Sequence, residues 1–272
     1  MQANGTNRLP TVISISQQKG GVGKTTTAAY LGAGLAERGE NCLMLDLASS
    51  GNLTSALGFN PESIKLTTSN LFQGAESPAD LVQTTSIGGL ALIPANASMS
   101  AVHRALYQKP DYELVLRKIV SHKFFSEFDF LIMDCPPGLD SININAIASA
   151  DLAILPVVCD IFSLQTLSNM FRLIKLARDR ANPNLSYRLL INRMNPEAPL
   201  QERVYRQIKS HYKTAVLNTV ISEDNSIPES QIEGSPLLTD KPETQAARQF
   251  QALSDEILSL EEIQKIKTNK KR

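Results

Sequence analysis

The chain has 272 residues, and its 27 basic and 27 acidic residues give it no formal net charge. This balance argues against a protein coated with positive charge, although it allows local basic patches. No segment approaches the roughly eighteen consecutive apolar residues of a membrane-spanning helix, and the first ten residues lack the apolar core of a signal peptide. The cysteines and histidines show no spacing typical of a metal site. We therefore expect a cytoplasmic protein.

Short apolar runs alternate along the chain with segments of helical pattern, beginning with a run at 12–16 and a helix at 25–38. Several runs are continuously apolar, which is typical of strands buried on both faces of a parallel sheet. The alternation predicts an α/β fold with a doubly wound, mostly parallel sheet flanked by helices. We expect a single domain at 11–260, with a leader at 1–10 and a basic tail at 261–272. The further expected strands are 42–45, 90–93, 128–134, 152–158, 187–192 and 216–220, and the further helices are 112–121, 164–181, 200–212 and 242–259.

A glycine-rich segment lies between the first expected strand and the first expected helix. Its glycines allow positive φ angles and a close approach of the backbone to phosphate oxygens. Consecutive N–H groups then form an anion site that the helix N-terminus completes. Lys24 is placed for the β- and γ-phosphates, and the Thr25 hydroxyl is placed for Mg²⁺. The pattern predicts a site for a nucleoside triphosphate with Mg²⁺, formed by Lys19, Gly20, Gly21, Val22, Gly23, Lys24, Thr25 and Thr26.

The apolar run at 128–134 ends in Asp134, which Cys-Pro-Pro-Gly follows. In doubly wound sheets, ligands bind beyond the carboxyl ends of the strands, so we expect Asp134 close to the glycine-rich segment. A carboxylate at this position can hold Mg²⁺ directly or through water. The alternative is an ordinary aspartate that caps the following turn. A phosphate-binding loop in the same chain favours the metal site.

The spacing Lys-Gly-Gly-x-Gly-Lys-Thr-Thr has Gln18 in place of the usual first glycine and an additional Lys19. It resembles the deviant Walker A box of the ParA/MinD family of P-loop ATPases, closest to the Soj-like ParA partitioning proteins. The resemblance extends from about 12 to 258. It implies ATP hydrolysis with Lys19, Lys24 and Asp134 as the catalytic residues. It also implies a face-to-face homodimer around two ATP molecules, in which Lys19 reaches the partner's nucleotide.

The same resemblance implies what the ATP is used for. Family dimers bind DNA without sequence preference, and a ParB-like or adaptor protein activates hydrolysis and release. Repeated cycles position plasmids, chromosomes or protein cargo over the nucleoid. We expect these partners and nucleoid association for this chain, without stable membrane association.

One position departs from the family's D-x-D-P-Q-G-N-x-T segment after the second strand. Asp46, Gly51, Asn52 and Thr54 match this pattern, but Ala48 stands where the second aspartate is expected. That carboxylate orients or activates the attacking water in the family, and such groups contribute on the order of 10²–10⁴ in rate. We therefore expect ATP binding with slow hydrolysis. The alanine belongs either to a naturally slow ATPase, in line with the divergent residues 49 and 50, or to an engineered change that traps the ATP state, which the intact surroundings favour.

The strand at 187–192 ends in Asn192, which Arg193 follows. By resemblance this is the base-recognition strand, since an amide can pair with an adenine edge through one donor and one acceptor. The alternative is a turn-forming asparagine. Asp134-Cys-Pro-Pro, together with Asn145, resembles the second nucleotide-responsive segment of the family.

A basic row lies on the expected helix at 200–212 and directly after it. Arg203, Arg206, Lys209 and Lys213 recur at spacings of three and four, so they share one face. Residues 265–272 add five positive charges. Together they predict salt-dependent DNA binding. The alternatives are a solvated helix face and a disordered tail.

Two other uses of the fold remain open. A MinD-like membrane-cycling ATPase needs a C-terminal amphipathic helix, and 253–266 has the apolar spacing only in part and carries several glutamates. An electron donor of the nitrogenase-reductase type needs cysteine ligands at the dimer interface, and the spacing of the cysteines in this chain does not fit that arrangement. The ParA-type role is therefore favoured.

Overall fold

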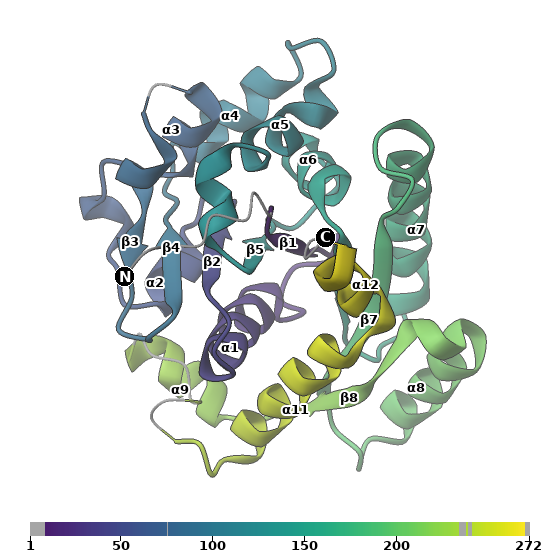
Figure 1. Cartoon of the computed structure of the whole chain (residues 1–272). Helices are drawn as coiled ribbons and strands as arrows, with labels where there is room; N and C mark the ends of the chain where they lie inside the picture. Colours follow the sequence, from purple (N-terminus) through teal and green to yellow (C-terminus); the bar gives the residue numbers. More distant parts are fainter. Residues whose placement is uncertain (1–8, 75, 234–237, 239–240, 270–272) are drawn as a thin grey trace.

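The computed structural model describes residues 9–74, 76–233, 238 and 241–269. Within this part of the chain, eight strands form one sheet with the order β3-β4-β2-β5-β1-β6-β7-β8, and only β3 is antiparallel to its neighbour (Figure 1). This architecture confirms the expected doubly wound α/β fold. The strands are β1 (Thr11–Ile15), β2 (Cys42–Asp46), β3 (Gln83–Thr84), β4 (Leu90–Ile93), β5 (Phe130–Asp134), β6 (Leu152–Val157), β7 (Ser186–Met194) and β8 (Val216–Ser222).

Helices cover both faces of the sheet, joined by short 3₁₀ turns. The helices are α1 (Lys24–Glu37), α2 (Asn52–Ala56), α3 (Thr68–Gln73), α4 (Met99–Leu106), α5 (Val115–Val120), α6 (Ser141–Ser149), α7 (Ser163–Arg180), α8 (Pro199–Tyr212), α9 (Ser226–Glu233), α11 (Gln245–Ser259) and α12 (Glu261–Asn269). The 3₁₀ turns are η1 (Pro61–Ser63), η2 (Pro78–Leu81), η3 (Tyr112–Leu114), η4 (Lys123–Glu127) and η5 (Lys213–Ala215).

Two apolar cores lie on opposite faces of the sheet. Neighbouring strand residues alternate between them, so Val12 belongs to one core and Ile13 to the other. Helices α3 to α8 pack on the first face, whereas α1 and α11 lie side by side on the second (Figure 1). Because both faces are buried, the strands carry continuous apolar runs rather than alternating ones.

The expected long helices form with small shifts at their ends. Two of them differ more: the segment at 112–121 divides into η3 and α5, and the segment at 242–259 begins as a helix only at Gln245. There Thr244 caps the helix by accepting a hydrogen bond from the backbone of Ala247. The structure adds the helices α2, α3, α4, α6, α9 and α12 to the expected ones.

The segment expected as a basic tail is ordered as helix α12 over its described part. Ile263 is completely buried in the second core, and Glu262 forms an ion pair of 2.6 Å with Arg188. Lys267 forms an ion pair with Glu40, and its ammonium lies 5.0 Å from the ring centre of Phe130. Sheet and helix residues thus supply partners for the charges of α12, which packs against the rest of the fold. Residues 270–272, also assigned to that tail, lie outside the described residues, as do residues 1–8 of the leader.

Among the helices in the described part of the chain, none has the length and apolar character needed to span a membrane.

Candidate nucleotide-binding site

The loop between β1 and α1 has the backbone geometry of a phosphate-binding loop. Gly21 and Gly23 adopt φ angles of 72° and 86°, which favour glycine. A Cβ atom on Gly23 would lie 2.2 Å from the Asn192 side-chain nitrogen, so this position also has no room for a methyl group. Helix α1 begins at Lys24, and Lys24, Thr25 and Thr26 of its first turn line the cleft that the loop borders. Such an end favours a bound anion.

Lys24 is buried, and its ammonium donates a hydrogen bond of 2.9 Å to the backbone carbonyl of Lys19. Burial lowers the pKa of Lys24, while the nearby Asp134 opposes this shift. The ammonium therefore lies in a position of low hydration beside the loop, where a phosphate would stabilise its charged form.

Two buried carboxylates end neighbouring strands next to this loop. Asp134 on β5 and Asp46 on β2 are paired in register. The Thr25 hydroxyl donates a hydrogen bond of 2.7 Å to one oxygen of Asp134. The other Asp134 oxygen, Oδ1, is buried and has no hydrogen-bond partner in the described part of the chain. An unsatisfied carboxylate oxygen beside a threonine hydroxyl fits a hard divalent cation such as Mg²⁺.

Burial raises the pKa of both carboxylates. The pKa of Asp134 rises to about 8, mainly through burial and secondly through the charge of Asp46. Burial also raises the pKa of Asp46 to about 6, against the effect of its hydrogen bonds. Without a cation, the two groups thus resist simultaneous ionisation, and a bound cation would relieve this repulsion.

Asp46 organises the loop that follows β2 rather than lining the cleft. Its carboxylate accepts hydrogen bonds from the backbone of Ala48 at 3.0 Å and from the backbone and hydroxyl of Thr54 at 3.0 and 2.8 Å. Gly51 has a φ of 63°, and a Cβ atom there would lie 2.8 Å from the Ala95 carbonyl. The loop therefore keeps a defined shape without the second aspartate, and Ala48 lines the cleft.

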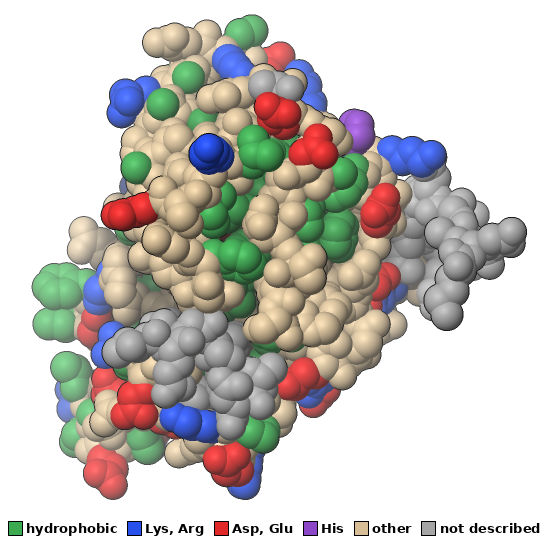
Figure 2. Space-filling model, turned by 90° about the vertical axis from the view of Figure 1, so that its left-hand side faces the viewer, with side chains coloured by type: hydrophobic (Ala, Val, Ile, Leu, Met, Phe, Trp, Pro, Cys, Tyr) green, Lys and Arg blue, Asp and Glu red, His purple; other side chains and the backbone are tan. Residues whose placement is uncertain are grey.

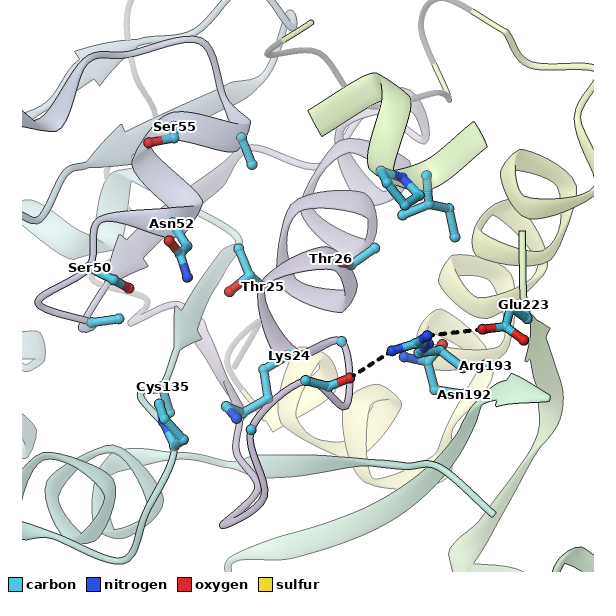
Figure 3. A pocket seen from close by; sticks show the side chains of 18 of the residues that line it. Lys24, Thr25, Thr26, Ser50, Asn52, Ser55, Cys135, Asn192, Arg193 and Glu223 are labelled. Carbon is cyan, nitrogen blue, oxygen red and sulfur yellow. Dashed lines mark hydrogen bonds and ion pairs between the residues drawn. The ribbon is translucent and has the colours of Figure 1, made fainter. Parts of the chain in front are cut away.

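The cleft has a volume of 660 Å³, which lies in the usual range for cofactor sites (Figure 3). The phosphate-binding loop and Lys24 form one part of its wall, and Asn192 and Arg193 form another, so both predicted parts of the nucleotide site face one space. Residues after β2 and after β8 also line it, namely Ser50, Ser55, Ala56, Asp224, Asn225, Ile227 and Pro228.

At the second wall, Asn192 and Arg193 both bind the phosphate-binding loop. The Asn192 amide donates a hydrogen bond of 2.7 Å to the Val22 carbonyl, a role that neither of its two sequence interpretations included. Arg193 has a φ of 53°, and its guanidinium donates to the Gly21 carbonyl at 3.3 Å and to Glu223 at 2.9 Å (Figure 3). These bonds connect β7 and β8 to the loop.

Asn145 of the Asp-Cys-Pro-Pro segment lies away from the cleft. Its buried amide accepts from the Leu116 backbone at 2.9 Å and donates to the Ser141 carbonyl at 2.8 Å, so it joins α6 to α5. The segment reaches the phosphate-binding loop through Gly138, whose N–H donates to the Gln18 carbonyl at 3.0 Å. The segment and the loop are thus in direct contact.

The predicted DNA-binding residues lie on α8 and do not join the cleft. Arg203 and Arg206 border a separate groove of 560 Å³ that also contains Glu202, and Glu202 pairs with Arg206 at 2.7 Å. Lys209 donates to the Tyr205 hydroxyl at 3.1 Å, and Lys213 is exposed after the helix end. Figure 2 shows the opposite side of the molecule, away from α8, and there basic and acidic side chains of the described chain are interspersed.

Comparisons with known proteins agree with this geometry. A sequence model described as an AAA domain matches residues 10–187. The chromosome partitioning protein ParA of Caulobacter vibrioides is 30% identical over 252 residues, which are 92% of this chain and 94% of ParA. The chain belongs to the ParA/MinD family of P-loop ATPases. Among further members, the sporulation initiation inhibitor protein Soj of Bacillus subtilis is 28% identical over 247 residues, covering 90% of this chain and 97% of Soj.

A structural comparison places the fold in the same ParA/MinD family. The septum site-determining protein MinD of Pyrococcus horikoshii, solved with Mg-ADP, superimposes with a TM-score of 0.75 at 26% identity, covering 92% of this chain and 97% of MinD. The resemblance that the sequence predicted from its Walker A box is therefore confirmed.

Proposed function

We propose that the chain binds ATP with Mg²⁺ in the cleft and hydrolyses it slowly. The observation that carries this proposal is the unsatisfied, buried oxygen of Asp134 beside Thr25. It lies where the phosphate-binding loop and the first turn of α1 offer N–H groups and Lys24 to an anion. A carboxylate, a hydroxyl and an anion site in this arrangement match the needs of a metal-bound triphosphate. The complex of MinD with Mg-ADP supports this assignment.

The residues of the cleft would divide the work between binding and charge stabilisation. Backbone N–H groups of residues 20–26 would hold the phosphates, and Lys24 would stabilise the charge that develops on the β- and γ-phosphates. Thr25 and Asp134 would hold Mg²⁺, which supplies positive charge to the phosphate oxygens when it is bound. Asn192 and Arg193 would border the base.

Slow hydrolysis follows from Ala48. Ala48 lines the cleft, but its side chain can neither accept a proton nor orient a water molecule, while Asp46 keeps the loop in place. The remaining residues stabilise charge without activating the nucleophile. The chain would therefore remain in its ATP state longer than a relative that carries the second aspartate.

The cellular role we propose is that of a ParA-type partitioning ATPase. ATP would pair two copies of the single domain at 11–260, extended by α12, with Lys19 reaching the partner's nucleotide. The dimer would bind DNA nonspecifically through the basic face of α8, and a ParB-like or adaptor protein would stimulate release. The names and high coverage of the ParA and Soj relatives support this role. It would place the protein in the cytoplasm, on the nucleoid.

A MinD-like membrane cycle is the second candidate, because MinD shares the fold. Such a cycle needs an amphipathic helix with free apolar residues. In α12, Ile263 is buried in the core, and Lys267 is paired with Glu40. The helix is thus already used within the domain, which favours the DNA-based role.

Calorimetry with ATP in magnesium buffer tests the binding proposal on the full chain. We expect one ATP per chain and loss of binding in Lys24→Ala, whereas Lys175→Ala, which removes an exposed lysine on α7, should bind as the parent does. Light scattering should then detect a dimer when ATP is present. With ATP, we expect the chain to shift DNA in a gel and not to pellet with liposomes. Absence of ATP binding would refute the whole proposal, and liposome binding without DNA binding would favour the MinD-like role.

A further inference from the structure

Two buried hydroxyl groups join α1 to α9. Tyr30 and Ser230 are each 1% exposed, and their hydroxyl oxygens lie 2.5 Å apart across 200 residues of sequence. The Ser230 hydroxyl also donates a hydrogen bond of 2.9 Å to the Ile227 carbonyl. Because a serine hydroxyl has a single proton, Tyr30 is then the donor to Ser230. The two bonds form one chain from α1 to the backbone of Ile227, which lines the cleft.

Helix α1 carries both the start of this hydrogen-bond chain and residues of the phosphate-binding loop end of the cleft. Thr26 lines the cleft, and Tyr30 follows four residues later, so the two side chains share a face of α1. The Tyr30 ring also packs against Phe250 of α11, with the ring centres 4.6 Å apart. Because the ring is buried and packed, its hydroxyl has a fixed place relative to the phosphate-binding loop.

Helix α9 is also anchored at its start, by Asp224. One Asp224 oxygen accepts hydrogen bonds from the backbone and the hydroxyl of the first residue of α9, at 2.9 and 2.5 Å. The other oxygen accepts from the backbone of Ala246 in the first turn of α11, at 3.3 Å. Ile227 and Pro228, which both line the cleft, lie between this anchor and Ser230.

The anchored part of α9 lies at the end of the cleft that we assign to the base. Arg193 pairs with Glu223, and α9 begins shortly after Glu223. Asn192 and Arg193 form a polar part of the wall, whereas Ile227 and Pro228 add an apolar part. Helix α9 packs against α2 and lies beside α1 (Figure 1). Apolar contact with a few polar groups is the usual lining of a site for a planar ring.

We propose that Tyr30 is a positioning residue for the base of the nucleotide. Through Ser230 it fixes α9 to the helix that begins at the phosphate-binding loop, so that Ile227 and Pro228 are in place before a nucleotide binds. The inference rests on the proposed binding of ATP in this cleft and adds the residue pair that sets the span between phosphate and base contacts. A wall that is already in place loses less conformational freedom on binding. Loss of either hydroxyl therefore weakens contacts to the base and leaves contacts to the phosphates unchanged.

Calorimetry with two ligands in magnesium buffer tests this assignment on the full chain. ATP carries a base and three phosphates, whereas inorganic tripolyphosphate carries the phosphates alone. We expect Tyr30→Phe and Ser230→Ala each to weaken ATP binding about three- to tenfold, the factor that corresponds to one hydrogen bond, without changing tripolyphosphate binding. The double variant should bind ATP no more weakly than the single variants do, because both hydroxyls act through one chain of bonds.

The matched control is Tyr205→Phe, which removes a hydroxyl that accepts a hydrogen bond from Lys209 on α8. This control should bind both ligands as the parent does. Equal ATP affinity in the parent, Tyr30→Phe and Ser230→Ala would overturn the inference. An equal loss of ATP and tripolyphosphate binding would also overturn it, because the two hydroxyls would then support the fold in general rather than the base.

Hydrogen exchange of the nucleotide-free chain tests the contact itself. The backbone amides of α9 should exchange several-fold faster in Tyr30→Phe and Ser230→Ala than in the parent, while the amides of α7 keep their rates. Unchanged exchange in α9 would contradict the anchoring role. A parent that binds tripolyphosphate but not ATP would overturn the base-side inference, and a parent that binds neither ligand would refute the proposed function. The exchange rates need no ligand, so they would still decide whether Tyr30 holds α9.

Discussion

Asp46 and Asp134 lie in register at the carboxyl ends of β2 and β5, so that two fully buried carboxylates are neighbours beside the phosphate-binding loop. Asp46 is saturated by three hydrogen bonds from its own loop, whereas Asp134 keeps one oxygen without a partner in the described part of the chain. The two aspartates thus differ in role: the first shapes the loop, and the second is free to accept a cation.

This pair predicts how stability depends on pH without nucleotide and Mg²⁺. Burial raises the pKa of Asp46 to about 6 and that of Asp134 to about 8, above the usual 3.8. Between about pH 4 and pH 8 the folded chain therefore binds protons that the unfolded chain has released, so this pair's contribution to stability falls as pH rises. We expect the melting temperature to fall across this window and Asp134→Asn to flatten the fall. Adding ATP with Mg²⁺ should raise the melting temperature more at about pH 8 than at about pH 5.5.

Calorimetric scans of parent and variant at several pH values would measure this effect. Asp179→Asn is a suitable control, because Asp179 is exposed and pairs with Lys175 on α7. If the melting temperature of Asp134→Asn changes with pH as much as that of the parent does, other groups cause the pH dependence.

Restoring the missing carboxylate should accelerate hydrolysis. Ala48 lies on the cleft wall, and its backbone is already fixed by Asp46. We expect Ala48→Asp to raise kcat by about 10²–10⁴, the range for a positioned general base, with little change in KM. Ala48→Asn introduces a side chain of about the size of aspartate that cannot accept a proton, so kcat should not increase comparably in this variant. Steady-state phosphate release measures both variants, and equal rates for Ala48→Asp and the parent would contradict the role assigned to this position.

Sequence patterns predict the local parts of the site well. A strand, a glycine-rich loop and a helix follow one another directly, so Lys24 and Thr25 are placed by neighbouring residues. Asp134 ends an apolar strand, and sites in parallel sheets form beyond the carboxyl ends of the strands. Asp134 is therefore expected at the same edge of the sheet as the glycine-rich loop, and Thr25 contacts it there.

The interactions that sequence patterns miss join segments far apart in the chain. Asp160 binds Lys19 across 141 residues, and Arg193 binds Gly21 across 172. No local pattern indicates such pairs. Helix α12 was missed for a related reason: its composition suits a solvated tail, and only the tertiary fold supplies Glu40 and Arg188 as partners for its charges.

The close approach of Gly23 and Asn192 gives a sharp test of the loop. Gly23→Ala combines a strained φ of 86° with a Cβ atom 2.2 Å from the Asn192 amide. We expect this variant to lose ATP binding and to melt at a lower temperature even without nucleotide. Gly88→Ala is the matched control, because a Cβ atom there meets no atom within 4 Å of the described structure. A Gly23→Ala variant that binds ATP as tightly as the parent would contradict the geometry of the loop.

The basic face of α8 predicts different effects for two neighbouring arginines. Arg206 is partly neutralised by Glu202, whereas Arg203 has no ion pair in the described part of the chain. We therefore expect Arg203→Ala to weaken DNA binding of the ATP state more than Arg206→Ala does. Removing an arginine that neutralises one phosphate should make the slope of log K against log salt shallower by about 0.9. Fluorescence anisotropy with labelled DNA at several salt concentrations measures this, and Lys175→Ala on α7 controls for the change in net charge alone. If all three variants bind DNA with the same affinity and slope, α8 is not the DNA-binding face.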